Sequence, residues 1–137
     1  MEAIFKHAKH EVFEDGYDSV FSRDIEDLVY NKNAAFSVVK SVREYLHSED
    51  MIGEIACEAL CVLGRIEHEQ SHSNRLRLLI EALSHDSHWV RDGATIGLSS
   101  MGDTSAIPYL KEAAKNETVK MMKKYMLLTA KELSEGG

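Results

Sequence analysis

The fold is decided by residues 86–115, which read DSHWVRDGATIGLSSMGDTSAIPYLKEAAK. Apolar residues recur in this stretch at spacings of three and four, the period of an α-helix with one buried face. Gly102 interrupts that period, and Pro108 follows at the start of the next helical segment, where its missing N–H costs little. The stretch therefore predicts a helix over residues 88–101, a turn, and a second helix over residues 105–115.

The same pattern recurs elsewhere in the chain. Matching residue types stand at a constant offset of 38 in two series, Ile52, Ala56, Leu60, Leu63 and Gly64 against Val90, Ala94, Leu98, Met101 and Gly102. Shorter series match at offsets of 31 and 29. A unit of two helices therefore repeats, and because one such hairpin has too little core of its own, the units must stack. Ala56 and Ala94 allow neighbouring helices to approach closely, and Gly64 and Gly102 are expected to end them.

The remaining sequence also has helical periodicity. It predicts further helices over residues 4–13, 18–30, 34–47, 51–67, 74–84 and 118–133. No run of alternating apolar and polar residues predicts a strand. We expect an all-α fold, an α-α superhelix or solenoid of stacked antiparallel hairpins with about eight helices. Residues 1–137 form one domain in this interpretation, with divergent helices over 1–50 and the clearest repeats over 51–133.

The motif residues resemble a known family. Val90–Ala94, Leu98, Met101–Asp103 and Ala106–Leu110 are similar to the short HEAT-like repeat of the type named after phycobilisome lyases. The resemblance implies an α solenoid, and it leaves several functions open because these repeats serve many roles. Deoxyhypusine hydroxylase, an enzyme with this repeat type, places an iron-binding His-Glu pair directly after the Val-Arg of the second helix. Asp92 and Gly93 occupy that position here, which argues against the hydroxylase.

Small acidic HEAT-like proteins also resemble immunity proteins of bacterial toxin systems. The leading hypothesis is therefore a non-enzymatic protein-binding module, most concretely an immunity protein that neutralises a toxin in the bacterial cytoplasm. Two alternatives stay open: a lyase- or hydroxylase-like enzyme or cofactor chaperone, and a regulatory or scaffold subunit of a larger assembly. The oligomeric state does not follow from the sequence.

The distribution of charge bears on the partner. The net charge is −7, with −5 over residues 1–50, −4 over 51–110 and +2 over 111–137. Phosphates of nucleic acid need a basic surface, so nucleic acid is disfavoured, whereas a basic protein such as a toxin domain would be attracted. No signal-peptide pattern and no apolar run of about 20 residues occurs, so we expect a cytoplasmic protein that does not enter a membrane.

Few side chains in the sequence suggest catalysis or metal binding. Cys57 and Cys61 lie four residues apart in one apolar helical segment, and metal binding would need further ligands. We interpret them as free thiols in a core. The histidine pairs His68/His72 and His85/His88 lack sequence support for a third ligand. No catalytic motif is present, so no catalytic residue, metal or cofactor is predicted.

A binding surface can be placed by helical geometry. The second helices of stacked hairpins usually line one side of the stack, which is available to ligands. The core face of the motif helix uses Val90, Ala94 and Leu98, which leaves other residues of that helix facing elsewhere. We predict a strip that contacts the partner, made of Glu54, Glu58, Trp89, Arg91, Asp92 and Thr95.

Overall fold

The computed structural model describes residues 20–31 and 33–136, and within them every regular element is a helix. The helices are α2 (Val20–Tyr30), α3 (Ala35–Leu46), α4 (Gly53–Arg65), α5 (His72–Ala82), α6 (His88–Met101), α7 (Ile107–Asn116) and α8 (Lys120–Gly136). Short 3₁₀ turns, Glu69–Ser71 and Thr104–Ala106, precede α5 and α7. The helix expected over residues 4–13 lies outside the described residues.

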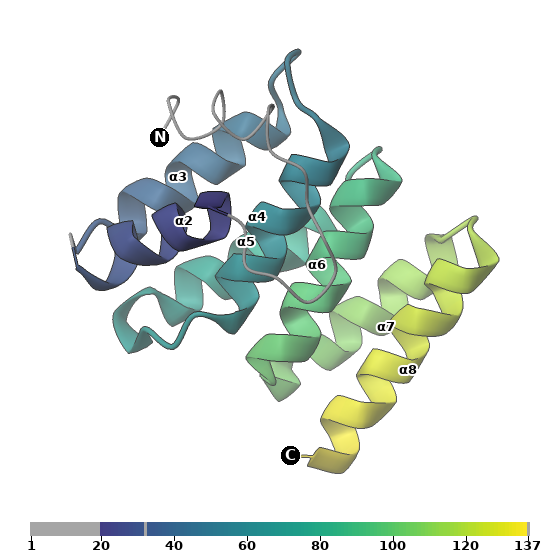
Figure 1. Cartoon of the computed structure of the whole chain (residues 1–137). Coiled ribbons are helices and arrows are strands. Elements are labelled where there is room, and N and C mark those ends of the chain that lie inside the picture. The colour runs from purple at the N-terminus through teal and green to yellow at the C-terminus, as the bar shows by residue number, and fades with distance from the viewer. Residues whose placement is uncertain (1–19, 32, 137) are drawn as a thin grey trace.

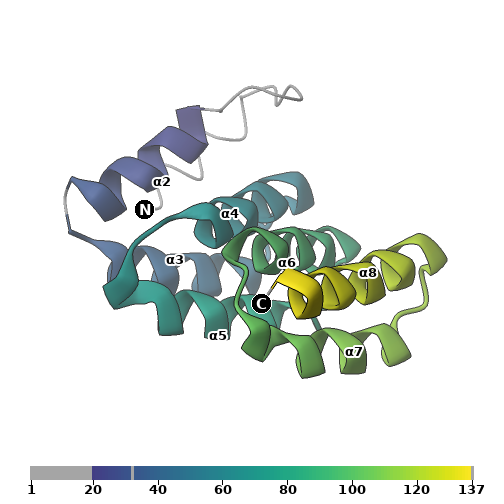
Figure 2. The same cartoon turned by 90° about the horizontal axis from the view of Figure 1, so that it is seen from below.

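The helices form antiparallel hairpins that stack in two layers. The hairpins are α3–α4, α5–α6 and α7–α8, and α2 packs against α3 and α4 (Figure 1). Helices α3, α5 and α7 make one layer, and α2, α4, α6 and α8 lie over them in the other (Figure 2). This arrangement confirms the predicted all-α solenoid of stacked hairpins. The seven helices described agree with the expected number of about eight.

One apolar core runs through the stack. The repeated positions are at its centre, since Ala56, Leu60, Val90, Ala94 and Leu98 are each 0% exposed. Burying each of the larger of these side chains stabilises the fold by roughly 1.5–3 kcal/mol relative to leaving it in water. The local 3.6-residue period thus identified the side of each helix that packs against its neighbours.

Glycines bring α4 and α6 unusually close together. A Cβ atom added to Gly93 would lie 2.8 Å from the Cα of Cys57, and one added to Gly97 would lie 2.7 Å from the carbonyl oxygen of Leu60. A Cβ atom on Gly64 would overlap the backbone of Gly97. The prediction that Gly64 ends its helix was therefore wrong, because α4 continues to Arg65 and Gly64 instead allows close helix contact. Gly102 does end α6, with a φ of 72° in the left-handed region.

A buried arginine fastens the long connection between α4 and α5. Arg75 is 2% exposed, and its guanidinium donates to the carbonyl oxygens of Leu63 and His68, both at 2.8 Å. It also donates to the hydroxyl of Ser71 at 2.9 Å. The extra residues that separate the first repeat from the second are therefore tied to the end of α4 and to the start of α5.

Candidate binding face

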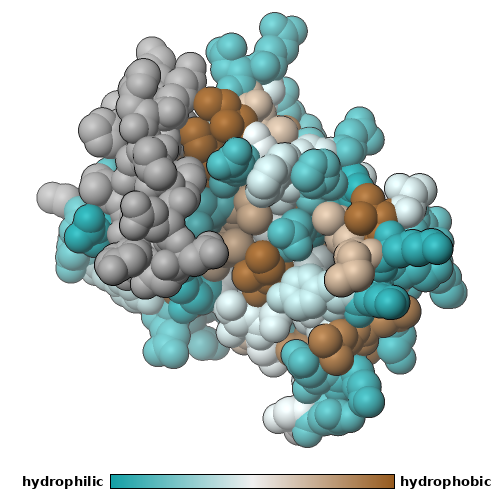
Figure 3. Space-filling view, turned by 45° about the vertical axis from the view of Figure 1, so that its right-hand side comes forward, coloured by the Kyte–Doolittle hydropathy of each residue, from teal (hydrophilic) through white to brown (hydrophobic). Residues whose placement is uncertain are grey.

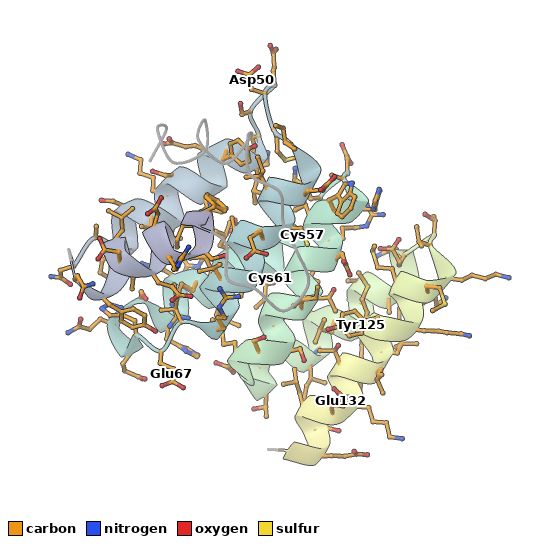
Figure 4. The ribbon with its side chains drawn as sticks, in the orientation of Figure 1. Asp50, Cys57, Cys61, Glu67, Tyr125 and Glu132 are labelled. Atoms are coloured by element: carbon orange, nitrogen blue, oxygen red, sulfur yellow. The ribbon has the colours of Figure 1, made fainter. Side chains whose placement is uncertain are left out.

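Helices α4, α6 and α8 each have a side turned away from the layer of α3, α5 and α7, and we call these three sides together the second-helix face. Helical spacing places on it Glu54, Cys57 and Cys61 of α4, Trp89, Asp92, Ile96 and Ser99 of α6, and Met121, Tyr125, Leu128 and Glu132 of α8. Cys57, Cys61, Tyr125 and Glu132 lie on the side turned toward the viewer in Figure 4. Asp92 acts electrostatically on Cys57 and on Tyr125, and Cys61 acts on Tyr125, so charged and polar side chains of all three helices influence one another here.

Large apolar side chains are exposed on this face. Met121 is 73% exposed, Leu128 is 50% and Trp89 is 40%. The indole of Trp89 lies over Gly53 at the start of α4, where an added Cβ atom would overlap its ring. Figure 3 shows apolar patches separated by hydrophilic residues on the surface that includes this side of the molecule. Exposed aromatic and thioether side chains of this kind are enriched at protein–protein contacts.

Asp92 lies half-buried in the middle of the face, and no hydrogen bond or ion pair to its carboxylate is formed within the described residues. Burial raises its pKa, and the effect outweighs the opposing influence of His88. Burial likewise raises the pKa of the neighbouring Tyr125. A carboxylate that has lost part of its hydration without gaining a partner is a ready acceptor for a cationic side chain from another molecule.

The other predicted acidic residues differ from each other. Glu54 is exposed in the first turn of α4 and is free to contact a partner. Glu58 is turned toward α2, where its carboxylate accepts a hydrogen bond from the buried hydroxyl of Ser22. Glu58 therefore borders the second-helix face and helps to hold α2 on the stack.

Two residues of the predicted strip have their side chains inside the structure. Arg91 forms a bidentate ion pair with Glu117 and donates to the carbonyl oxygens of His85 and Asp86, at 2.9 and 2.8 Å. Thr95 is 0% exposed, and its hydroxyl donates to the carbonyl oxygen of Arg91 at 2.9 Å. Neither side chain lies on the second-helix face, because the third hairpin covers that side of α6. The role of the strip in partner binding stays a prediction for Glu54, Trp89 and Asp92, with Glu58 at its edge.

The sequence interpretation missed the contribution of α8. Met121, Tyr125, Leu128 and Glu132 follow one another at spacings of three and four, which places them on one stripe of that helix. Its lysines Lys120, Lys124 and Lys131 form a separate stripe on the same helix. Both stripes can be recognised from their spacing in the sequence. Nothing in the local sequence shows which of the two lies beside α6.

Three of the four histidines considered as metal ligands have hydrogen-bond partners. His68 Nδ1 is 2.9 Å from the hydroxyl of Ser71, and His72 Nε2 is 2.6 Å from Asp103 Oδ2. His85 Nε2 donates to the carbonyl oxygen of Leu46 at 2.8 Å. Among residues 20–31 and 33–136, no group of three or more His, Cys, Asp or Glu side chains is arranged to hold a metal ion.

No helix in the described part of the chain has the length and apolarity needed to cross a membrane. No curated protein and no solved structure matches the sequence. The family model of HEAT repeats matches residues 34–124, a range that begins just before α3 and ends within α8. This range holds the first two hairpins, α7 and the start of α8, and it covers about two thirds of the 137 residues, so the chain belongs to the HEAT repeat family.

Proposed function

We propose that this protein is a non-enzymatic binding module, and that its second-helix face binds a partner segment with both basic and apolar side chains. HEAT repeats suggest a role in protein interaction or as a scaffold. Stacked repeats build an extended surface from successive helices, and α4, α6 and α8 supply such a surface here.

The observation that carries this proposal is the position of Asp92. Its half-buried carboxylate has no hydrogen-bond or ion-pair partner within the described residues, and the exposed side chains of Trp89 and Met121 lie on the same face. An arginine or lysine from a partner would supply the missing counter-charge, and apolar side chains beside it would cover the exposed indole and thioether. Binding sites commonly combine an aromatic anchor with a desolvated charged pair in this way.

A more specific form of the proposal makes the partner a toxin that this chain neutralises. The net charge of −7 supports it, because complementary charge speeds the encounter with a basic protein and favours it over other proteins.

Charge reversal on the face tests the general proposal. The double variant Glu54→Lys/Asp92→Lys should lose a partner that the tagged wild type retains from native lysate, as identified by mass spectrometry. A matched control, Glu44→Lys/Glu112→Lys, changes the net charge equally on exposed residues of α3 and α7 in the other layer, and it should retain the partner. If both double variants retain the same partner with wild-type affinity, the second-helix face is not the binding surface.

Trp89→Ala provides an independent test, because it removes the aromatic anchor without changing the charge. We expect an affinity loss of roughly 2 kcal/mol, about 30-fold, as for other interface tryptophans.

Co-expression tests the toxin form: a retained partner that stops growth when expressed alone should become harmless with the wild-type chain, but not with Glu54→Lys/Asp92→Lys. A partner that is harmless when expressed alone would contradict the toxin form and leave the binding module intact.

A further inference from the structure

Cys57 and Cys61 form a pair of thiols on the second-helix face that partner binding does not explain. They are the two cysteines of the chain, and both are free and half-buried on α4. Their side chains interact with each other electrostatically. Figure 4 shows both on α4, with α6 between this helix and Tyr125 of α8. Two adjacent thiols that solvent can reach are able to act as one ligand.

The spacing of the pair suits a metal ion that takes two ligands. Residues four apart on a helix place their Cβ atoms about 5–6 Å apart. Two metal–thiolate bonds of about 2.3 Å each separate their sulfur atoms by at most about 4.6 Å. Because each Cβ–Sγ bond can lean toward the other, α4 can hold both sulfur atoms on one ion without unwinding.

Two carboxylates lie near the pair. Those of Glu58 and Asp92 act electrostatically on both thiols, and no cationic side chain of the described residues does so. Their negative charge attracts a metal cation but also opposes loss of the thiol protons, so the site requires an ion whose bonds to sulfur are strong enough to displace both protons.

The choice of metal follows from the number of ligands. Zn²⁺ in proteins takes four ligands, and the described residues offer no group of three or more that could hold an ion. Soft thiolates select Cu(I), which is stable with two sulfur ligands. We propose that Cys57 and Cys61 form a two-coordinate site for Cu(I), or for a thiophilic ion of the same class. Binding replaces two S–H bonds by two S–Cu bonds, releases two protons and leaves copper in the Cu(I) state.

Anaerobic titration of the full chain with Cu(I), in competition with a chromophoric Cu(I) chelator, tests the site. We expect one equivalent to bind to the wild type and to Ser100→Ala, an exposed neighbour on α6. Cys57→Ser and Cys61→Ser each remove a metal ligand. Loss of a residue that only supports a ligand weakens metal binding roughly 10–100-fold, so each serine variant should weaken binding by more than that. Zn²⁺ should not compete at equal concentration.

A second measurement keeps the proposal testable if a serine variant fails to fold. Cu(I) should protect Cys57 and Cys61 of the wild type from alkylation, as read directly from the mass of the protein. Alkylation of both residues at the same rate with and without Cu(I) would overturn the proposal, as would wild-type affinity in either serine variant. Equal affinity for Zn²⁺ would show that the site is not two-coordinate. None of these results depends on whether a protein partner binds.

Discussion

Arg91 and Glu117 join two successive hairpins through a bidentate ion pair. Arg91 Nε lies 2.7 Å from Oε1 of Glu117, and Nη2 lies 3.2 Å from Oε2. The carboxylate also accepts from the backbone N–H of Val119, at the start of α8. The side chains are 16% and 1% exposed, so the pair is largely shielded from water. Burial raises the pKa of Glu117, but the hydrogen bonds from Arg91 and Val119 lower it more, and the net effect is a lowered pKa.

Replacing Arg91 should therefore destabilise the stack strongly. Arg91→Leu leaves the carboxylate of Glu117 buried without a counter-charge, and we expect the free energy of unfolding to fall by about 3–5 kcal/mol. Chemical denaturation measures the change. The exposed pair of Glu112 and Lys115, with side chains 68% and 75% exposed, is the control. Glu112→Ala should change the stability by less than about 1 kcal/mol. Equal effects of Arg91→Leu and Glu112→Ala would show that the buried pair contributes little.

Acid should weaken the turn between α6 and α7. Hydrogen bonds from His72 and Ser105 lower the pKa of Asp103 to about 2. An unfolded aspartate has a pKa of about 3.9, so this carboxylate stabilises the fold fully above that pH, and the contribution is lost as pH falls toward 2. Asp103→Asn should lower the free energy of unfolding at neutral pH by about 2 kcal/mol and make its acid dependence shallower between about pH 4 and 2. Urea unfolding across that range measures both, and an unchanged slope would contradict the assignment.

The contact between α4 and α6 should not tolerate a methyl group. Gly97→Ala places a Cβ atom 2.7 Å from the carbonyl oxygen of Leu60 and 2.8 Å from Leu79 Cδ2, so the two helices must separate. We expect the free energy of unfolding to fall by about 1–3 kcal/mol. Gly102→Ala is the comparison, because nothing lies within 4 Å of the added atom and only the φ of 72° is unfavourable. That strain costs about 1–2 kcal/mol. A structure of the Gly97 variant should show the helices further apart, and an unchanged separation would contradict this account.

Arg75 should stabilise the connection between α4 and α5 through its hydrogen bonds. Arg75→Leu keeps much of the buried volume but leaves the carbonyl oxygens of Leu63 and His68 without this donor. The carbonyl oxygen of His68 still accepts from Ser71, so the loss falls mainly on that of Leu63. A buried acceptor left unpaired costs about 1–3 kcal/mol. We expect a lower unfolding free energy and faster amide hydrogen exchange in residues 66–71. Exchange that speeds up evenly over the whole chain would indicate a global effect instead.

Features set by the local sequence could be predicted, whereas features set by contacts between repeats could not. A helix with one buried side imposes a 3.6-residue period on its own sequence, so the helices and the central position of Ala56 and Ala94 could be predicted. The role of Gly64 could not be predicted, because its closest contact is Gly97 in the next repeat. A glycine near the end of a helix looks the same in sequence whether it ends the helix or allows a neighbouring helix to pack closely against it.

The sequence by itself determined that the chain folds into stacked helical hairpins, because the apolar period, the turns and the repeated spacing are all local features. Only the tertiary structure decided which polar side chains remain available for binding. Arg91 and Thr95 are polar like their neighbour Asp92, yet the third hairpin covers them and leaves Asp92 half-exposed. The same packing brings Tyr125 beside Asp92 and Cys61. The local sequence around a polar residue does not show whether another residue will cover it, because the covering residue belongs to another repeat.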